Sequence, residues 1–303
     1  MEQHVRTHHP VLTGLRARRR LAPYLLSAPG SLWLLVFFVI PVATMLVLSL
    51  ETPITTQGFL QAGYRFTWNV GIYGQGFSLY HTQFVRSVAY GTLVTLITLA
   101  VGYPVAYWIA FWGGRRKNTY LFVLLLPFFV SFVIRTLVWR FILSDSGFVL
   151  TFLRQLHLVP SQFHVLSTAS AVIAGISYNA LPFMILPLYV SLEKIDRTVV
   201  EAAKDLYARN TAVFTKVVLP LSIPGIFAAI LLTFVPAVGD YVNASILGGT
   251  GTTMIGNVIQ YEYLTAADYP MAAALSFILM LGLLVAILAY ARALGTRQIE
   301  EYL

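Results

Sequence analysis

The sequence predicts an all-α polytopic membrane protein with six transmembrane helices. Its residues are 58% hydrophobic and only 11% charged, whereas about 25% of the residues of a soluble domain are charged. Apolar segments of about twenty residues or more, the length that crosses a bilayer, recur along the chain, and the first of them, residues 31–50, carries no charge. The net charge of +8 comes from basic residues that flank these segments. We therefore attribute this charge to membrane topology and not to a nucleic-acid-binding surface.

The apolar segments give the expected order of the elements. A basic tail, residues 1–30, precedes the first span, and no signal-peptide cleavage site is obvious there. Residues 31–294 are expected to form the transmembrane domain, and residues 295–303 a short C-terminal tail. The spans themselves are expected at residues 31–50, 87–112, 119–143, 165–192, 221–247 and 271–291.

Two further features of this plan follow from composition. Residues 51–86 hold many aromatic residues and glycines, so we expect a polar and aromatic connection at the membrane interface. Residues 144–164 are expected to be a second loop. Pro182 and Pro187 are expected to interrupt the fourth span, because proline lacks the amide that a helix uses.

The positions of lysine and arginine predict that both termini lie in the cytoplasm. Basic residues remain on the cytoplasmic side of membrane proteins. With the N-terminus inside, every lysine and arginine falls on that side except Arg65, Arg86, Arg135, Arg140 and Arg154. The segment 193–220, between the fourth and fifth spans, is then also cytoplasmic.

This segment is predicted to be a helical hairpin. Thr198 and Glu201 have the spacing of a capping box, in which a hydroxyl and a carboxylate bond the first amides of a helix. Asn210 is expected to cap a second short helix, which Pro220 would end. The first helix carries an apolar ridge that either packs on the protein's own membrane helices or docks a partner, and it is formed by Val199, Ala202, Ala203 and Leu206.

A family resemblance rests on these residues. Glu201-Ala202-Ala203, Leu219-Pro220 and Pro224-Gly225-Ile226 resemble the EAA loop of permease subunits of bacterial ATP-binding-cassette importers. Further stretches resemble the spermidine/putrescine-type permeases of that family, so that the likeness covers roughly residues 85–295. These stretches are Leu181-Pro182-Phe183-Met184, Leu186-Pro187-Leu188-Tyr189, Glu193-Lys194-Ile195-Asp196 and Ile255-Gly256-Asn257-Val258-Ile259.

The resemblance implies a function and a set of partners. The chain would be a permease subunit in the bacterial cytoplasmic membrane, in contact with lipid, and would import a polyamine. It would pair with a second permease chain, two cytoplasmic ATPase subunits and an external solute-binding protein. The residues that the resemblance assigns to ATPase coupling are Thr198, Glu201, Ala202, Ala203, Asp205, Leu206, Tyr207 and Phe214.

One residue departs from the family pattern. Tyr207 stands where the family usually has a glycine between the coupling helices. A tyrosine held at positive φ costs about 1 kcal/mol. We therefore expect either a different turn geometry or a strained conformation at Asn210 instead.

The sequence excludes several catalytic functions. It contains no G-x-x-x-x-G-K-[ST] loop to hold nucleotide phosphates, and neither H-E-x-x-H nor G-x-S-x-G. It also lacks cysteine. We therefore expect no enzyme, no metal site and no cofactor in this chain, with ATP and magnesium on a partner ATPase.

Polar residues within and beside the spans are candidates for a translocation path. Asp240, with Tyr241 and Asn243, is placed to meet a cationic substrate from outside, since ionisable residues in spans usually face a cavity or a partner. The alternative is that Asp240 pairs with Arg135 or Arg140.

Two further pairs belong to this predicted path. Tyr178 and Asn179 either line a gap between helices or form helix–helix hydrogen bonds. Glu262 and Asp268 are expected to form an acidic outer mouth.

Other functions remain open at this stage. A related importer for an anion or a sugar would fit, and Arg135 and Arg140 favour an anion. A proton-coupled carrier would use Asp240 as its relay, and a structural membrane subunit would transport nothing.

Overall fold

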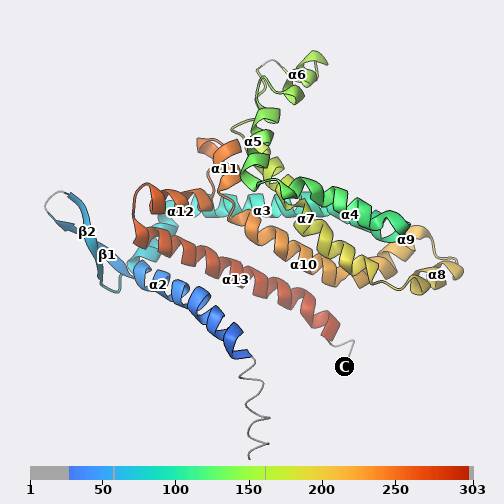
Figure 1. Ribbon diagram of the computed structural model, residues 1–303, viewed down its shortest axis with the longest axis horizontal. Coiled ribbons are helices and arrows are strands. Elements are labelled where there is room, and N and C mark those ends of the chain that lie inside the picture. The colour runs from blue at the N-terminus through green and yellow to red at the C-terminus, as the bar shows by residue number, and fades with distance from the viewer. Residues whose placement is uncertain (1–26, 57–58, 161, 300–303) are drawn as a thin grey trace, which may run out of the picture. The chain divides into compact units, whose positions relative to one another are not determined.

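The computed structural model describes residues 27–56, 59–160 and 162–299, and these contain six helices long and apolar enough to cross a membrane (Figure 1). The prediction of an all-α polytopic protein is confirmed. The chain divides into two compact units, Met1–Ile72 and Tyr73–Leu303. The six candidate spans are Ser27–Ser49, Gly71–Trp112, Phe132–Gln155, Ala169–Glu193, Asn210–Val238 and Tyr269–Arg292.

The first unit contains the first span and a β-hairpin. Large apolar side chains such as Trp33 and Phe37 are exposed along the span, as expected of a helix that faces lipid. Two antiparallel strands follow, with Glu51 opposite Phe66. The predicted connection therefore begins with regular structure, which the β-branched residues after Glu51 favour. The elements of this unit are η1 (Leu35–Val39), α2 (Ile40–Ser49), β1 (Glu51–Thr56) and β2 (Phe59–Phe66).

The second span is much longer than predicted. Helix α3 runs from Gly71 to Trp112, with a local departure from helical geometry at Tyr80 (φ −115°, ψ 17°). One of the glycines that indicated a connection, Gly76, serves packing instead. A Cβ at Gly76 would lie 3.1 Å from side-chain atoms of both Met271 and Leu275. Glycine thus lets α3 approach the last helix closely.

The third span is broken, which the sequence analysis did not predict. Helix α4 (Lys117–Leu125) passes into the turn η3 (Leu126–Phe129), and α5 (Phe132–Leu143) begins after an extended residue, Val130. Pro127 has no amide to continue the hydrogen bonds of α4, but the chain stays helical through Phe129, and the break lies at Val130 and Ser131, whose ψ angles are 143° and 137°. In Figure 1, α5 leaves the direction of α4 and leads to α6 (Phe148–Gln155), which occupies part of the predicted loop.

Two helices form the centre of the second unit. Helices α7 (Ala169–Glu193) and α10 (Leu219–Val238) lie side by side (Figure 1). Contrary to the prediction, Pro182 and Pro187 do not interrupt α7. Membrane helices accommodate proline where neighbouring groups satisfy the freed backbone.

The remaining elements follow α10. The predicted fifth span ends early, at Val238, and the chain turns before a short helix, α11 (Val242–Leu247). Helix α12 (Ile255–Leu264) lies in the predicted outer loop and packs on α13 (Tyr269–Ile299), which extends beyond the predicted sixth span into the predicted tail.

Candidate functional site

The hairpin between α7 and α10 begins differently from the prediction. Helix α8 spans Arg197–Asp205, and its cap is Asp196, whose Oδ1 accepts the amide of Thr198 at 2.9 Å. The predicted capping box of Thr198 and Glu201 is therefore wrong, since both residues lie within the helix. The hydrogen bond from Thr198 lowers the pKa of the Asp196 carboxyl below its ordinary value.

The second half of the hairpin is continuous with the fifth span. Helix α9 (Asn210–Val213) passes through the π-helical turn η4 (Phe214–Val218) into α10. The side chain of Asn210 is not its cap, and Pro220 does not end it. The wide turn lies directly before Pro220, where the proline ring would clash with a regular helical carbonyl. The segment from Asn210 to Val238 is thus one helix.

The predicted apolar ridge of α8 divides between two surfaces. Ala203 packs against the protein's own core, beside the buried Val200. Val199, Ala202 and Leu206 are exposed, and Leu206 retains 82% of its accessible surface. Most of the ridge therefore remains free on the described chain and is available to a partner.

Tyr207 itself adopts the left-handed conformation. Its φ is 59° and its side chain is 97% exposed. Both expectations for this turn are wrong, because the tyrosine takes the strained position directly. The conformation costs about 1 kcal/mol, and the exposed ring makes no compensating buried contact.

The hairpin is anchored to neighbouring helix ends. Lys117 at the start of α4 forms an ion pair with Glu193 at the end of α7. The Nη2 of Arg197 donates to the carbonyl of Ala110 in α3 at 3.1 Å. Phe214 packs edge-on against Tyr103, with ring centroids 5.7 Å apart.

Two of the predicted coupling residues also face a hollow beside the hairpin. Glu201 and Phe214 line a cavity of about 540 Å³ between the hairpin and the end of α3. Asp205, by contrast, is exposed at the end of α8.

A buried polar network joins α5, α7, α11 and the turn before α11. The Oδ1 of Asn243 accepts the hydroxyl of Thr136 at 3.1 Å and the Nδ2 of Asn179 at 3.2 Å. Its Nδ2 donates to Asp240 at 2.6 Å, and its backbone amide to the other Asp240 oxygen at 2.9 Å. An added Cβ at Gly175 would collide with Leu247, so glycine allows α11 to approach α7. The sequence analysis did not identify Thr136, although a polar residue within an apolar span indicates a possible hydrogen-bonding site.

Asp240 does not pair with an arginine in the part of the chain that the structure describes, where neither Arg135 nor Arg140 forms an ion pair. Its carboxylate instead faces Asn243 and lines a cavity of about 230 Å³. Asn179 and Tyr241 line the same cavity. Three of the predicted path residues therefore meet at one place.

Tyr178 lies apart from this group. Its ring stacks on Phe128 and contacts Trp139, with centroids 5.8 and 5.4 Å away. The guanidinium of Arg135 lies over the same Phe128 ring at 4.3 Å. Adjacent positions in the sequence, Tyr178 and Asn179, thus serve an aromatic cluster and a polar network.

The predicted acidic mouth does not form as expected. Glu262 is only 7% exposed, and its Oε1 accepts the hydroxyl of Tyr80 at 2.5 Å. Asp268 accepts the amide of Met271 at 3.0 Å and so caps the start of α13. Each carboxylate is therefore bonded to a partner within the protein.

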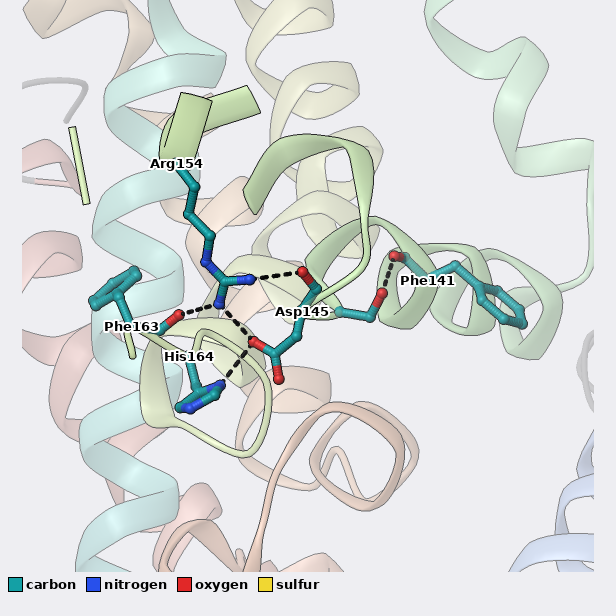
Figure 2. A network of polar contacts seen from close by, with 6 residues as sticks. Phe141, Asp145, Arg154, Phe163 and His164 are labelled. Atoms are coloured by element: carbon teal, nitrogen blue, oxygen red, sulfur yellow. Dashed lines mark hydrogen bonds and ion pairs between the residues drawn. The ribbon is translucent and has the colours of Figure 1, made fainter. Parts of the chain in front are cut away.

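A separate polar cluster fixes the loop around α6, as Figure 2 shows. Arg154 donates to the carboxylate of Asp145 at 3.1 Å and to the carbonyls of Asp145 and Phe163, each at 2.9 Å. His164 bonds the same carboxylate oxygen at 2.7 Å. These contacts hold both ends of the loop together, and sequence spacing gave no sign of them.

The described residues contain no group of three or more histidine, aspartate or glutamate side chains that could hold a metal ion.

Comparisons with known proteins place this geometry in a family. Residues 102–297 match the model of the binding-protein-dependent transport system inner membrane component. The chain is 36% identical to the spermidine/putrescine transport system permease protein PotB of Escherichia coli K12 over 215 residues, 71% of this chain and 78% of that protein. It is 35% identical to PotB of Haemophilus influenzae over 271 residues, 88% and 93% of the two chains.

The fold also matches solved structures. A chain of a bacterial ABC transporter involved in alginate import superposes with a TM-score of 0.66 at 18% identity, over 94% of this chain and 98% of that one. At this identity the likeness concerns the fold alone.

Proposed function

This chain belongs to the family of binding-protein-dependent transport system inner membrane components, and we propose that it is the polyamine-specific permease subunit of an ATP-driven importer. It is a multi-pass inner membrane protein and a non-catalytic subunit. The proposed substrate rests on the 35% identity of this chain to a spermidine/putrescine permease, over 88% of its length.

We propose that the chain acts with several partners. A second permease chain completes the path, two cytoplasmic ATPase subunits bind and hydrolyse ATP with magnesium, and an external solute-binding protein delivers the substrate. Both termini and the hairpin lie in the cytoplasm in this arrangement. The distribution of lysine and arginine supports this orientation.

The exposed ridge on α8 would be the contact with the ATPase. Val199, Ala202 and Leu206 offer apolar surface at the tip of the hairpin. Thr198, Glu201 and Asp205 would supply polar contacts around the ridge, and Tyr207 extends it. Ala203 and Phe214 face the protein's own core and would transmit force inward.

A continuous helix makes this transmission physically direct. Because Asn210–Val238 has no break, a push on the hairpin moves the far end of α10, which lines the cavity beside Asp240. ATP-driven closure of the ATPases would therefore alter access to that cavity. Asp240, Tyr241, Asn243 and Asn179 would form the path there, whereas Tyr178, Glu262 and Asp268 do not line this cavity.

Uptake of labelled putrescine by cells that express the chain with its partner subunits tests the proposal. Glu201→Ala and Leu206→Ser are expected to lower uptake and stimulated ATP hydrolysis while the protein remains in the membrane. Leu264→Ser is the matched control, since Leu264 is also largely exposed but lies on α12. Unchanged uptake in both hairpin variants would count against coupling through α8.

Vesicles without any ATPase separate the rival functions. Uptake driven by a proton gradient alone would indicate a secondary carrier, and no flux with all partners present would indicate a structural subunit. Purification of the chain with its partners, followed by mass analysis, would identify the bound chains.

An importer for an anion is the second candidate, and one observation favours it. Arg135 has two buried guanidinium nitrogens, Nε and Nη1, without a hydrogen-bond partner. Such a group attracts an anion.

A further inference from the structure

We infer that the 230 Å³ cavity between α5, α7 and α10 binds one primary ammonium group of the substrate through a wall of hydrogen-bond acceptors. This inference rests on the proposed function and deepens it. It adds Thr233 and two backbone carbonyls to the path residues named above. The residues that line the cavity include Phe132, Asn179, Phe183, Leu232, Thr233 and Asp240.

Two side-chain oxygens at this cavity have no partner. The Oδ1 of Asn179 and the Oγ1 of Thr233 are buried without a hydrogen bond, and their residues are only 6% and 1% exposed. An unpaired buried polar group costs about 1–3 kcal/mol. Both groups belong to residues that line one cavity, and a ligand there that reached them would complete their hydrogen bonds.

Thr233 differs from other helical threonines of this chain. A threonine within a helix usually satisfies its hydroxyl by donating to the carbonyl four residues earlier. Thr233 lacks this bond. The threonines that make it are Thr44, Thr92, Thr95, Thr98, Thr136 and Thr215.

Two prolines add further acceptors to the wall. Pro236 has no amide to donate to the carbonyl of Leu232, and Pro187 has none for the carbonyl of Phe183. Both Leu232 and Phe183 line the cavity. The two prolines thus leave main-chain oxygens without their usual helical donor beside the unpaired side chains.

The charge of the cavity selects a cation. Asp240 lines it, and no lysine, arginine or histidine is among the described residues that do. The guanidinium of Arg135 lies over the ring of Phe128 and is 5.9 Å from the ring of Phe132, which itself lines the cavity. Phe132 thus lines the cavity, whereas Arg135 does not.

An ammonium group fits these features. A primary ammonium carries three donors and no acceptor, which complements a wall of carboxylate, amide, hydroxyl and carbonyl oxygens. The rings of Phe132 and Phe183 offer apolar surface for the attached methylene chain. A quaternary ammonium has the same charge but no N–H to donate, so the wall should distinguish the two.

Equilibrium binding of labelled putrescine tests this directly. The importer is purified through a tag on this chain, placed in nanodiscs and measured without the external binding protein, so that the cavity is the site observed. Thr233→Val removes the hydroxyl with little change of shape. We expect it to weaken putrescine binding about tenfold, the loss of one hydrogen bond to a charged group.

Two controls make the result specific. Thr98→Val removes an equally buried hydroxyl that already bonds the Val94 carbonyl and should leave the dissociation constant within about twofold, since it does not line the cavity. The bis(trimethylammonium) analogue of putrescine should bind the wild type and Thr233→Val equally. An equal loss for both probes, an equal effect of Thr98→Val, or no effect of Thr233→Val would overturn the inference.

The outcomes for the cavity and for the proposed function are separable. If cells take up putrescine but the Thr233→Val variant binds putrescine as tightly as the wild type, the cavity inference fails and the importer assignment stands. If cells take up no polyamine but n-butylamine binds in a Thr233-dependent manner, the cavity inference stands and the polyamine assignment fails. Absence of binding by every amine tested would overturn the cavity inference.

Discussion

The hydroxyl of Tyr80 donates a hydrogen bond of 2.5 Å to Glu262 and thereby joins α3 to α12. Tyr80 is the residue at which α3 departs from helical geometry, and Glu262 is buried. The bond therefore fixes the bend of α3 and provides a partner for a carboxylate that water barely reaches. The two residues are 182 positions apart in the sequence, so no local sequence pattern predicts the bond.

Tyr80→Phe is expected to lower the free energy of unfolding by about 1–3 kcal/mol, because the buried carboxylate loses its donor. Thermal or denaturant unfolding in detergent measures the change. Tyr261→Phe is the control, since the Tyr261 side chain is 56% exposed and lies next to Glu262. Equal stability of wild type and Tyr80→Phe would mean that this bond does not hold α3 to α12.

Tyr207→Gly is expected to stabilise the protein by about 0.5–1 kcal/mol, because glycine adopts positive φ without the steric cost that tyrosine bears. The ring is almost fully exposed, so no packing is lost. Unfolding measurements compare it with Tyr207→Ala, which removes the ring but keeps the strain and should show no gain. A gain of the same size in Tyr207→Ala would contradict the strain argument.

The cap of α8 is expected to weaken in acid. The amide of Thr198 lowers the pKa of the Asp196 carboxyl, so the charged cap stabilises α8 at higher pH. That contribution is lost as the pH falls through the ordinary value of 3.8 towards the lower folded value. Hydrogen exchange of residues 197–205, corrected for the intrinsic rate at each pH, measures it.

Asp196→Asn separates charge from capping. Asparagine also caps helices but does not titrate, so protection of α8 should no longer depend on pH in this range. An unchanged pH dependence in this variant would assign the effect to another group.

The spans were predictable because they depend on local composition. The runs predicted at residues 31–50 and 165–192 are apolar over a bilayer's thickness, and the structure has helices at Ser27–Ser49 and Ala169–Glu193. The errors arose where distant contacts decide. Gly76 lies within α3 and packs on α13, the third span breaks at Val130 and Ser131, and Pro182 does not break the fourth.

The candidate site was predictable in part for the same reason. Asp240, Asn179 and Asn243 were identifiable as polar residues in apolar surroundings, and the structure brings them together. Their partner Thr136 lies on another helix, so its role required the fold. Glu262 was misjudged because its donor, Tyr80, belonged to a segment predicted to be a connection.

Asp240→Asn is expected to lower putrescine uptake at least tenfold, because it removes the carboxylate from the cavity while keeping the side chain's shape. The attraction between opposite charges is strong where water is scarce. Transport by cells with all partner subunits is the measurement. Asp268→Asn is the matched control, since Asp268 caps α13 and does not line the cavity. The same measurement with Arg135→Gln decides the sign of the substrate's charge. If Asp240→Asn leaves polyamine uptake intact while Arg135→Gln abolishes uptake of an anion, the permease carries anions. The guanidinium that lies over Phe128 would then be the group that binds them.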